Sequence, residues 1–181
     1  MNRKLNTEEI RRVSVDEYRR MAKIPLVLVL DNVRSMHNIG AVLRTADAFC
    51  IEKVVLCGIT ATPPNNEIHK SALGAEFSVC WEYSPEAQTP VRTLRDEGYR
   101  VLAVEQTQDS TPLGSLHIEG AIKYALVLGN EVSGVEQATI DLCDGSVEIP
   151  QYGTKHSLNV SVAAGIVVWE FAKKIGKGEE V

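Results

Sequence analysis

The stretch IPQYGTKHSLNVSVAAGIVVWE, residues 149–170, carries the pattern on which the predicted fold depends. We interpret it as the end of a buried strand, a Pro-Gly loop and then a long helix that begins near Ser157. Ser157 and Asn159 are residue types that cap helix starts, where free backbone N–H groups also hold anions or polar ligands. Over residues 160–172 the helix has almost no polar face, so we expect it to pack under its own sheet and against a second subunit. One element is therefore predicted to join a ligand-binding loop to an oligomer interface.

The rest of the chain alternates apolar runs with helical patterns. Residues 26–30 form a continuous apolar run, which is typical of a strand covered on both faces. The first helix is expected to begin at Thr7 and to end by Ile24, and Pro90 is expected to disrupt the middle of a later one. Further strands are predicted at 53–57, 78–83, 99–104, 123–128 and 147–149, and further helices at 39–49, 67–73, 84–97 and 135–142. This alternation predicts an α/β fold with a mostly parallel sheet flanked by helices.

Length and charge indicate one domain with a basic extension. The 181 residues are enough for a single core. We expect residues 25–181 to form that domain and residues 1–24 to form an N-terminal basic helical extension. The net charge of the chain is −5, yet this extension carries more basic than acidic side chains. A local basic patch can bind phosphates on an acidic protein, although a solvated amphipathic helix is the alternative.

The cysteine and histidine residues argue against a metal site. The four cysteines and four histidines are scattered, and no Cys-x-x-Cys pair occurs. We therefore expect buried, reduced thiols, a cytoplasmic protein and no bound metal. No apolar run reaches the roughly 20 residues that span a bilayer, so no membrane partner is expected.

Polar clusters follow three of the predicted strands, at residues 31–44, 129–134 and 150–159. The carboxyl ends of parallel strands share one edge of a sheet, where ligands bind, so we expect a single site. Arg44 lies in an otherwise apolar helix and is expected to meet a carboxylate, a phosphate or a substrate hydroxyl; a structural ion pair is the alternative. Gly40 suits the close approach of another backbone or of a ligand.

Taken together, the three clusters resemble a known family. Their motifs are Asn38-Ile39-Gly40-Ala41 with Arg44-Thr45-Ala46, then Gly129-Asn130-Glu131 with Gly134, then Ile149-Pro150 with Ser157-Leu158-Asn159-Val160-Ser161. They resemble motifs 1, 2 and 3 of the SpoU/TrmH class of the SPOUT methyltransferases, and the resemblance covers residues 26–171. It implies a C-terminal deep trefoil knot, a homodimer, and 2′-O-methylation of ribose in structured RNA with S-adenosylmethionine as methyl donor. A tRNA substrate is favoured over rRNA.

The resemblance also implies roles for individual residues. The positions that match the family's catalytic residues are Asn38, Arg44, Glu131, Ser157 and Asn159. The positions that match its cofactor-binding residues are Leu128, Gly129, Asn130, Ile149, Ser157 and Leu158. The chain departs from the family at Val132, where many relatives have Gly, and at Gln151, where an apolar residue is common. A β-branched residue resists positive φ, so we expect the turn at Val132 to differ in shape.

Chemistry limits what Arg44 can do. A guanidinium with a pKa above about 12 is a poor proton acceptor, so we expect Arg44 to stabilise the developing alkoxide and to hold the adjacent phosphate. Glu131 is expected to orient Arg44 or to cap the helix that follows it. RNA phosphates are expected at residues 1–23, Arg34, His37 and loops of the partner subunit. Two alternatives stay open: a non-catalytic RNA-binding knot protein, and a methyltransferase for small molecules or proteins.

Overall fold

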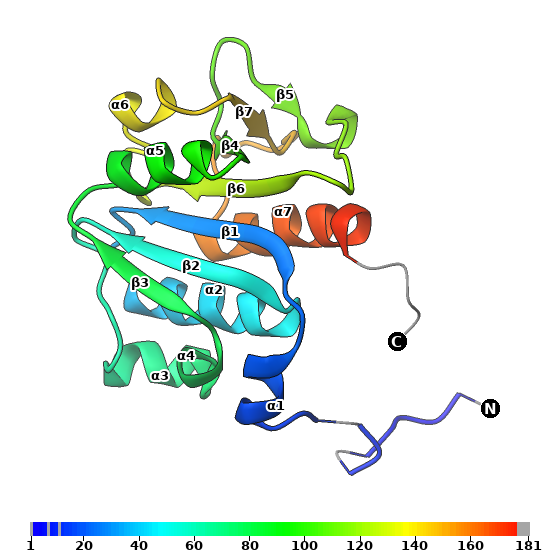
Figure 1. Cartoon of the computed structure of the whole chain (residues 1–181). Coiled ribbons are helices and arrows are strands. Elements are labelled where there is room, and N and C mark those ends of the chain that lie inside the picture. Colours follow the sequence, from blue (N-terminus) through cyan, green and yellow to red (C-terminus); the bar gives the residue numbers. More distant parts are fainter. Residues whose placement is uncertain (1, 7, 11, 177–181) are drawn as a thin grey trace.

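The computed structural model describes residues 2–6, 8–10 and 12–176, and within them seven parallel strands form one sheet (Figure 1). The strands lie in the order β3-β2-β1-β6-β4-β7-β5. In chain order they are β1 (Ile24–Asp31), β2 (Ile51–Cys57), β3 (Trp81–Ser84), β4 (Tyr99–Val104), β5 (Thr111–Pro112), β6 (Lys123–Leu128) and β7 (Gly145–Glu148). The central pair β1 and β6 is thus built from distant parts of the sequence.

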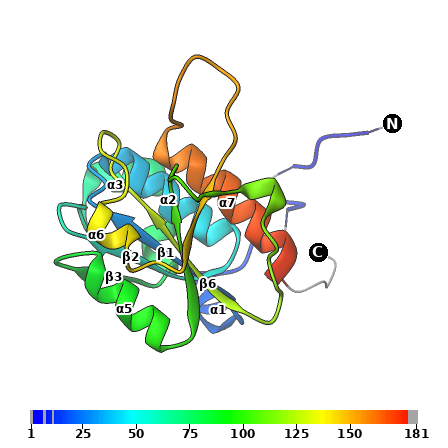
Figure 2. The same cartoon turned by 90° about the horizontal axis from the view of Figure 1, so that it is seen from above.

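Both faces of this sheet are covered, as the apolar run in β1 predicts. Leu26, Leu28 and Leu30 enter one core while Val27 and Val29 enter the other, because successive side chains of a strand point to opposite faces. The first core includes α1 (Val15–Arg20), α2 (Met36–Ala48), α3 (Asn66–Ala72), α4 (Ala75–Ser78), the 3₁₀ turn η1 (Leu113–Ser115) and α7 (Val160–Ile175). The second includes α5 (Gln88–Asp96) and α6 (Gln137–Ile140) (Figure 2). The predicted α/β class is confirmed.

The predicted boundaries hold best for buried strands. β4 and β6 have the predicted bounds, 99–104 and 123–128. The third strand was predicted to begin at residue 78, but that residue ends α4 and β3 begins at Trp81. The disruption predicted at Pro90 is also wrong: this residue lies in the first turn of α5, where backbone N–H groups have no helical partner to lose.

The N-terminal helix is shorter than predicted. Residues 8–10 form turns, Thr7 lies outside the described residues, and α1 begins only at Val15. Ser14 caps it, because its Oγ accepts from the backbone N–H of Glu17 (3.2 Å) and the Glu17 carboxylate accepts from the backbone N–H of Ser14 (2.7 Å). Among the described residues of the expected helical extension, only α1 is helical.

The C-terminal helix begins at Val160 rather than near Ser157. Its cap is Asn159, whose Oδ1 accepts from the backbone N–H groups of Ser161 (2.9 Å) and Val162 (3.4 Å). Ser157 stays in the preceding loop, because the Asn159 cap makes a second cap redundant. The helix has the predicted apolar character. One face enters the core, while Val162, Ile166 and Trp169 remain 51, 37 and 55% exposed.

The thiols are free but mostly not buried. Cys57 is buried, and this burial raises the pKa of its thiol to about 12. Cys80 is exposed, and Cys50 and Cys143 are half-buried. The expectation of buried thiols therefore fails for these three, because each lies in a connection between two elements rather than within a central strand.

Gly40 marks the place where α2 meets α3. A methyl group on Gly40 would lie 2.1 Å from Ser71 Oγ and 2.3 Å from the backbone oxygen of Ile68. Across the same contact, Ser71 Oγ donates to the backbone oxygen of His37 (2.9 Å). We had expected Gly40 to allow the close approach of either another backbone or a ligand, and the structure shows the backbone of α3 in that place.

We predict that Gly40→Ala lowers the free energy of unfolding by about 1–3 kcal/mol, because α3 must move away from α2 to admit the methyl group. Urea denaturation followed by circular dichroism measures this change. Gly114→Ala is the matched control, since a methyl group there meets no atom within 4 Å. Equal stability of the two variants would contradict the tight contact.

Candidate active site at the carboxyl edge of the sheet

A pocket of about 440 Å³ lies across the carboxyl ends of β4, β6 and β7. One wall is the turn after β6, residues 129–134, which we call the 129–134 turn. The other is the loop after β7, residues 149–159, which we call the 149–159 loop. All six residues predicted to bind cofactor line this pocket: Leu128, Gly129, Asn130, Ile149, Ser157 and Leu158. Two of the predicted polar clusters therefore meet here, and Glu131 and Asn159 line the same pocket.

The first cluster joins this site through the carboxylate of Glu131. Its Oε1 accepts from the backbone N–H of Ser35 (3.0 Å) and from Asn38 Nδ2 (2.9 Å), and its Oε2 accepts from the backbone N–H of Arg34 (3.0 Å). Burial alone would raise the pKa of Glu131, but these hydrogen bonds outweigh it and hold the pKa below its ordinary value. Glu131 thus holds the segment that leads into α2. We had expected it to orient Arg44 or to cap the helix that follows Glu131, and the structure shows neither contact among the described residues.

Asn38 connects the second and third clusters. It is buried at the first turn of α2, donates to Glu131, and accepts from Asn159 Nδ2 through its Oδ1 (3.1 Å). Side chains that follow β1, β6 and β7 are therefore linked in one chain of hydrogen bonds, which we call the Asn38 bridge: Glu131, Asn38 and Asn159.

Asn130 shapes the 129–134 turn with its side chain. Its Nδ2 donates to the backbone oxygen of Asn32 (2.8 Å), and its Oδ1 accepts from the backbone N–H of Val132 (2.8 Å). The backbones of Asn130 and Gly134 also pair with each other at 2.9 Å in both directions. Gly134 takes the positive φ, 70°, so Val132 avoids this strain and stands 82% exposed at the tip.

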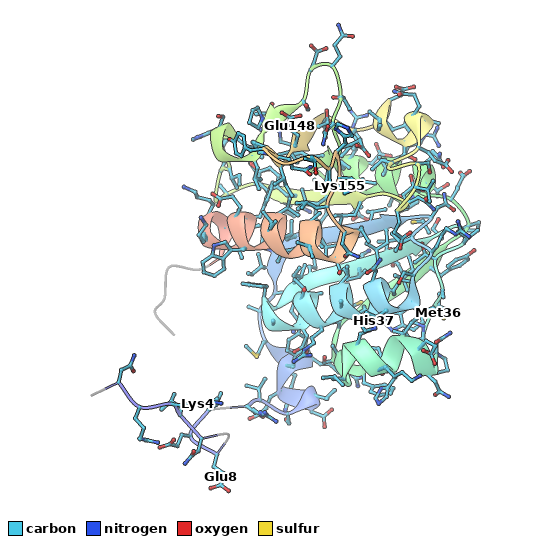
Figure 3. All side chains as sticks on the ribbon, turned by 180° about the vertical axis from the view of Figure 1, so that it is seen from behind. Lys4, Glu8, Met36, His37, Glu148 and Lys155 are labelled. Carbon is cyan, nitrogen blue, oxygen red and sulfur yellow. The ribbon has the colours of Figure 1, made fainter. Side chains whose placement is uncertain are left out.

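Arg44 does not share this pocket within its own chain. It is exposed on α2 and lines a separate hollow with His37 and Lys70, where α2 and α3 meet. Figure 3 shows His37 at the start of α2 and Lys155 on the 149–159 loop. Among the described residues, the Arg44 guanidinium has no hydrogen bond and no ion pair. The alternative for Arg44, a structural ion pair, is therefore not found in this part of the chain, and its expected contact with a phosphate or a substrate hydroxyl stays a prediction.

The described residues offer neither a metal site nor a membrane-spanning helix. No cluster of three His, Cys, Asp or Glu side chains within the described residues could hold a metal ion. Nor does any helix in that part of the chain have the length and apolar character that crossing a membrane requires.

This arrangement of motifs matches that of a known family. The model of the SpoU rRNA Methylase family matches residues 25–169. The chain belongs to this family. The SpoU/TrmH resemblance drawn from the three motifs is thereby confirmed.

Relatives within the SpoU family carry names for two kinds of RNA. The 23S rRNA (guanosine-2′-O-)-methyltransferase RlmB of Neisseria meningitidis is 32% identical over 92% of this chain and 66% of its own length. The tRNA (guanosine(18)-2′-O)-methyltransferase of Thermus thermophilus is 30% identical over 90% of this chain and 81% of its own. The AdoMet-bound rRNA methyltransferase of Sinorhizobium meliloti superposes with a TM-score of 0.77 at 26% identity, over 91% of this chain and 62% of its own. The chain spans only 55–66% of the length of several RlmB relatives.

Two pocket residues escaped the sequence analysis. Glu105 and Gln106 follow β4 and line the pocket between the two walls. The signal was present, because the rule that ligands bind at the carboxyl ends of parallel strands applies to β4 as much as to its neighbours. The polar run that begins at Glu105 belongs to none of the three motifs.

We predict that Glu131→Gln lowers the free energy of unfolding by about 1 kcal/mol at neutral pH, a figure reduced for solvent screening at this exposed side chain. The amide cannot accept three hydrogen bonds with both of its polar atoms. Because the pKa of Glu131 is lowered on folding, the stability that it adds is present above its ordinary value and is lost as the pH falls through the lowered one.

Urea denaturation between pH 3 and 7 measures this effect as the difference between wild type and variant. Glu119→Gln is the matched control, because Glu119 is exposed and its carboxylate makes no hydrogen bond within the described residues. A difference that stays constant down to the lowest pH would contradict the assigned role of the carboxylate.

Proposed function

We propose that this protein transfers the methyl group of S-adenosylmethionine to a ribose 2′-hydroxyl of structured RNA, with tRNA favoured over rRNA. The observation that carries this proposal is the Asn38 bridge at the edge of the pocket, because it joins the polar residues of three family motifs at one place. The names of the relatives support ribose methylation of RNA, and they include enzymes for both tRNA and rRNA.

The lining of the pocket suits this cofactor. Its volume, about 440 Å³, lies within the range of small-molecule sites. Val104, Leu128, Val147 and Val160 supply apolar surface for an adenine ring, beside the backbone of Gly129 and Leu158. Glu105, Glu131 and Glu148 also line it, and no lysine or arginine does so within the described residues. Such a lining favours a cationic sulfonium over an anionic ligand.

The chain's own groups have separate tasks in this reaction. The cofactor supplies an activated methyl group, so the protein must align the 2′-hydroxyl with it and exclude water. Asn38 and Glu131 hold the start of α2 against the pocket. Arg44 stabilises the oxygen as its proton passes to a phosphate, a water molecule or a neighbouring group, and it binds the adjacent phosphate; its guanidinium remains protonated throughout.

We further propose that Arg44 serves the pocket of a second subunit. The apolar stripe of Val162, Ile166 and Trp169 on α7 is exposed, and a second copy of the chain would bury it. This stripe adjoins α2, because Trp169 packs on Phe49 with ring centroids 5.9 Å apart. A partner seated on α7 therefore lies beside the exposed face of α2 that carries Arg44. Such a homodimer would give each pocket the cation that its own chain does not bring.

The proposed knot is consistent with the path of the chain. After β7, which lies beyond β4, the chain returns across the sheet so that α7 packs on α2 and the β1 side of the core. We propose that this return completes the deep trefoil knot that the family resemblance implies.

We predict that Arg44→Ala lowers the rate of methyl transfer by about 10²–10³-fold, the usual effect of removing one group that stabilises a developing anion. Binding of S-adenosylmethionine, measured by isothermal titration calorimetry, should stay within twofold of wild type. The substrate is RNA from cells that lack the protein, with ribose methylation mapped by nucleotide. Arg92→Ala on the opposite face of the sheet is the control. Cofactor binding without any methylation in wild type would favour the non-catalytic RNA-binding alternative.

A complementation test decides whether Arg44 acts across subunits. Arg44→Ala and Ser157→Trp homodimers should both be inactive, the second because its pocket is filled. When the two variants are mixed and exchange subunits, about a quarter of wild-type activity should return. Half of the dimers are then mixed, and each mixed dimer has one complete site, made of the intact pocket of one subunit and Arg44 of the other. No recovery in dimers shown to be mixed by mass spectrometry would place Arg44 in its own chain's site.

A further inference from the structure

The 149–159 loop is almost free of hydrogen bonds to the rest of the molecule. It projects from the body between β7 and α7 (Figure 2). Before Asn159, one hydrogen bond joins it to the remainder of the described residues: Gln106 Nε2 donates to the backbone oxygen of His156 (2.8 Å). Tyr152 is 97% exposed at the outer part of the loop. A loop with so few tethers is mobile unless something fixes it, and within the described residues Gln106 makes the one such hydrogen bond before Asn159.

The residue before Gln106 holds the opposite wall. Glu105 Oε2 accepts from the backbone N–H of Val135 (3.1 Å), directly after the 129–134 turn. The same oxygen lies where a methyl group on Gly134 would be, at 2.1 Å from the ideal position. Glu105 is thus pressed against the backbone of the turn, and only a glycine at position 134 leaves room for it.

The side chains of Glu105 and Gln106 project from backbone that directly follows β4. The backbone N–H of Glu105 donates to the oxygen of Val147 (3.1 Å), so the ladder between β4 and β7 continues through this residue. Glu105 reaches the end of the turn after β6, and Gln106 reaches the loop after β7. Two adjacent residues therefore span the pocket.

We propose that Glu105 and Gln106 are positioning residues that set the separation of the two pocket walls for S-adenosylmethionine. This inference rests on the proposed function, because it assigns the pocket to that cofactor. Neither residue belongs to the three motifs, and neither needs to touch the reacting atoms. Gln106 acts by ordering the 149–159 loop before the cofactor arrives, which reduces the entropy lost on binding.

Gln106→Ala tests the tether to the loop. Loss of one neutral hydrogen bond weakens S-adenosylmethionine binding by about fivefold. The KM for the cofactor rises by a similar factor, whereas kcat at saturating cofactor and the Tm of the free protein stay unchanged. Gln106→Glu, which keeps the shape but has no N–H to donate, behaves like the alanine variant. Gln108→Ala is the matched control, because this nearby glutamine is exposed and makes no hydrogen bond within the described residues.

Limited digestion with trypsin reports on the loop without any cofactor. Lys155 is exposed and precedes the tethered His156, so the free loop of Gln106→Ala is cut after Lys155 several-fold faster than that of wild type. Glu105→Ala frees the other wall instead. It weakens cofactor binding at least as much and leaves cleavage after Lys155 unchanged.

The outcomes separate this inference from the proposed function. The positioning role is overturned if Gln106→Ala has the same cofactor affinity and the same rate of cleavage after Lys155 as wild type and Gln108→Ala. The proposed function would stand in that case. A wild-type protein that binds no S-adenosylmethionine would overturn both. Weaker binding with faster cleavage, found in both Gln106 variants and absent from the control, supports the assignment.

Discussion

One buried amide, that of Asn38, holds together three strand ends that lie far apart in the sequence. An amide is suited to this position because it donates with its nitrogen and accepts with its oxygen. Its nitrogen meets the Glu131 carboxylate after β6, and its oxygen meets Asn159 before α7. A carboxylate in its place would face Glu131 with like charge, and an apolar side chain would leave Glu131 one donor short. The geometry of the site depends on this exchange more than on any residue that faces solvent.

The helix that carries Asn38 divides its tasks by direction. Asn38 faces the pocket, Gly40 faces the backbone of α3, and Arg44 faces solvent. Six helical residues correspond to a rotation of about 240°, so Asn38 and Arg44 cannot both reach one pocket from the same short stretch of helix. The same helix also touches α7 through the contact of Phe49 with Trp169. This geometry is the reason that we propose an active site built from two subunits, in which catalysis would depend on association.

The sequence predicted the layers of the fold well and the local detail less well. Continuous apolar runs predict buried strands because few other structures hide both faces, and so β1, β4 and β6 were found. Helix starts were missed where a side-chain cap decides the boundary, as at Ser14 and Asn159. Family motifs brought Glu131 and Asn38 to the same site, but no pattern could show that Glu131 holds the Arg34–Ser35 backbone. The position of Gln106 after β4 could have placed it at the pocket, but its hydrogen bond to a distant backbone oxygen leaves no trace in local sequence.

The order of strands in the sheet has a consequence for how the chain is made. Leu26 in β1 pairs with Tyr124 in β6, about 100 residues later in the sequence. During synthesis, one side of β1 therefore remains without a partner until most of the protein has left the ribosome. An unpaired apolar strand is prone to join strands of other chains. The nascent protein is thus expected to depend on chaperones for longer than its modest length suggests, and to fold slowly because its central contacts are so distant in sequence.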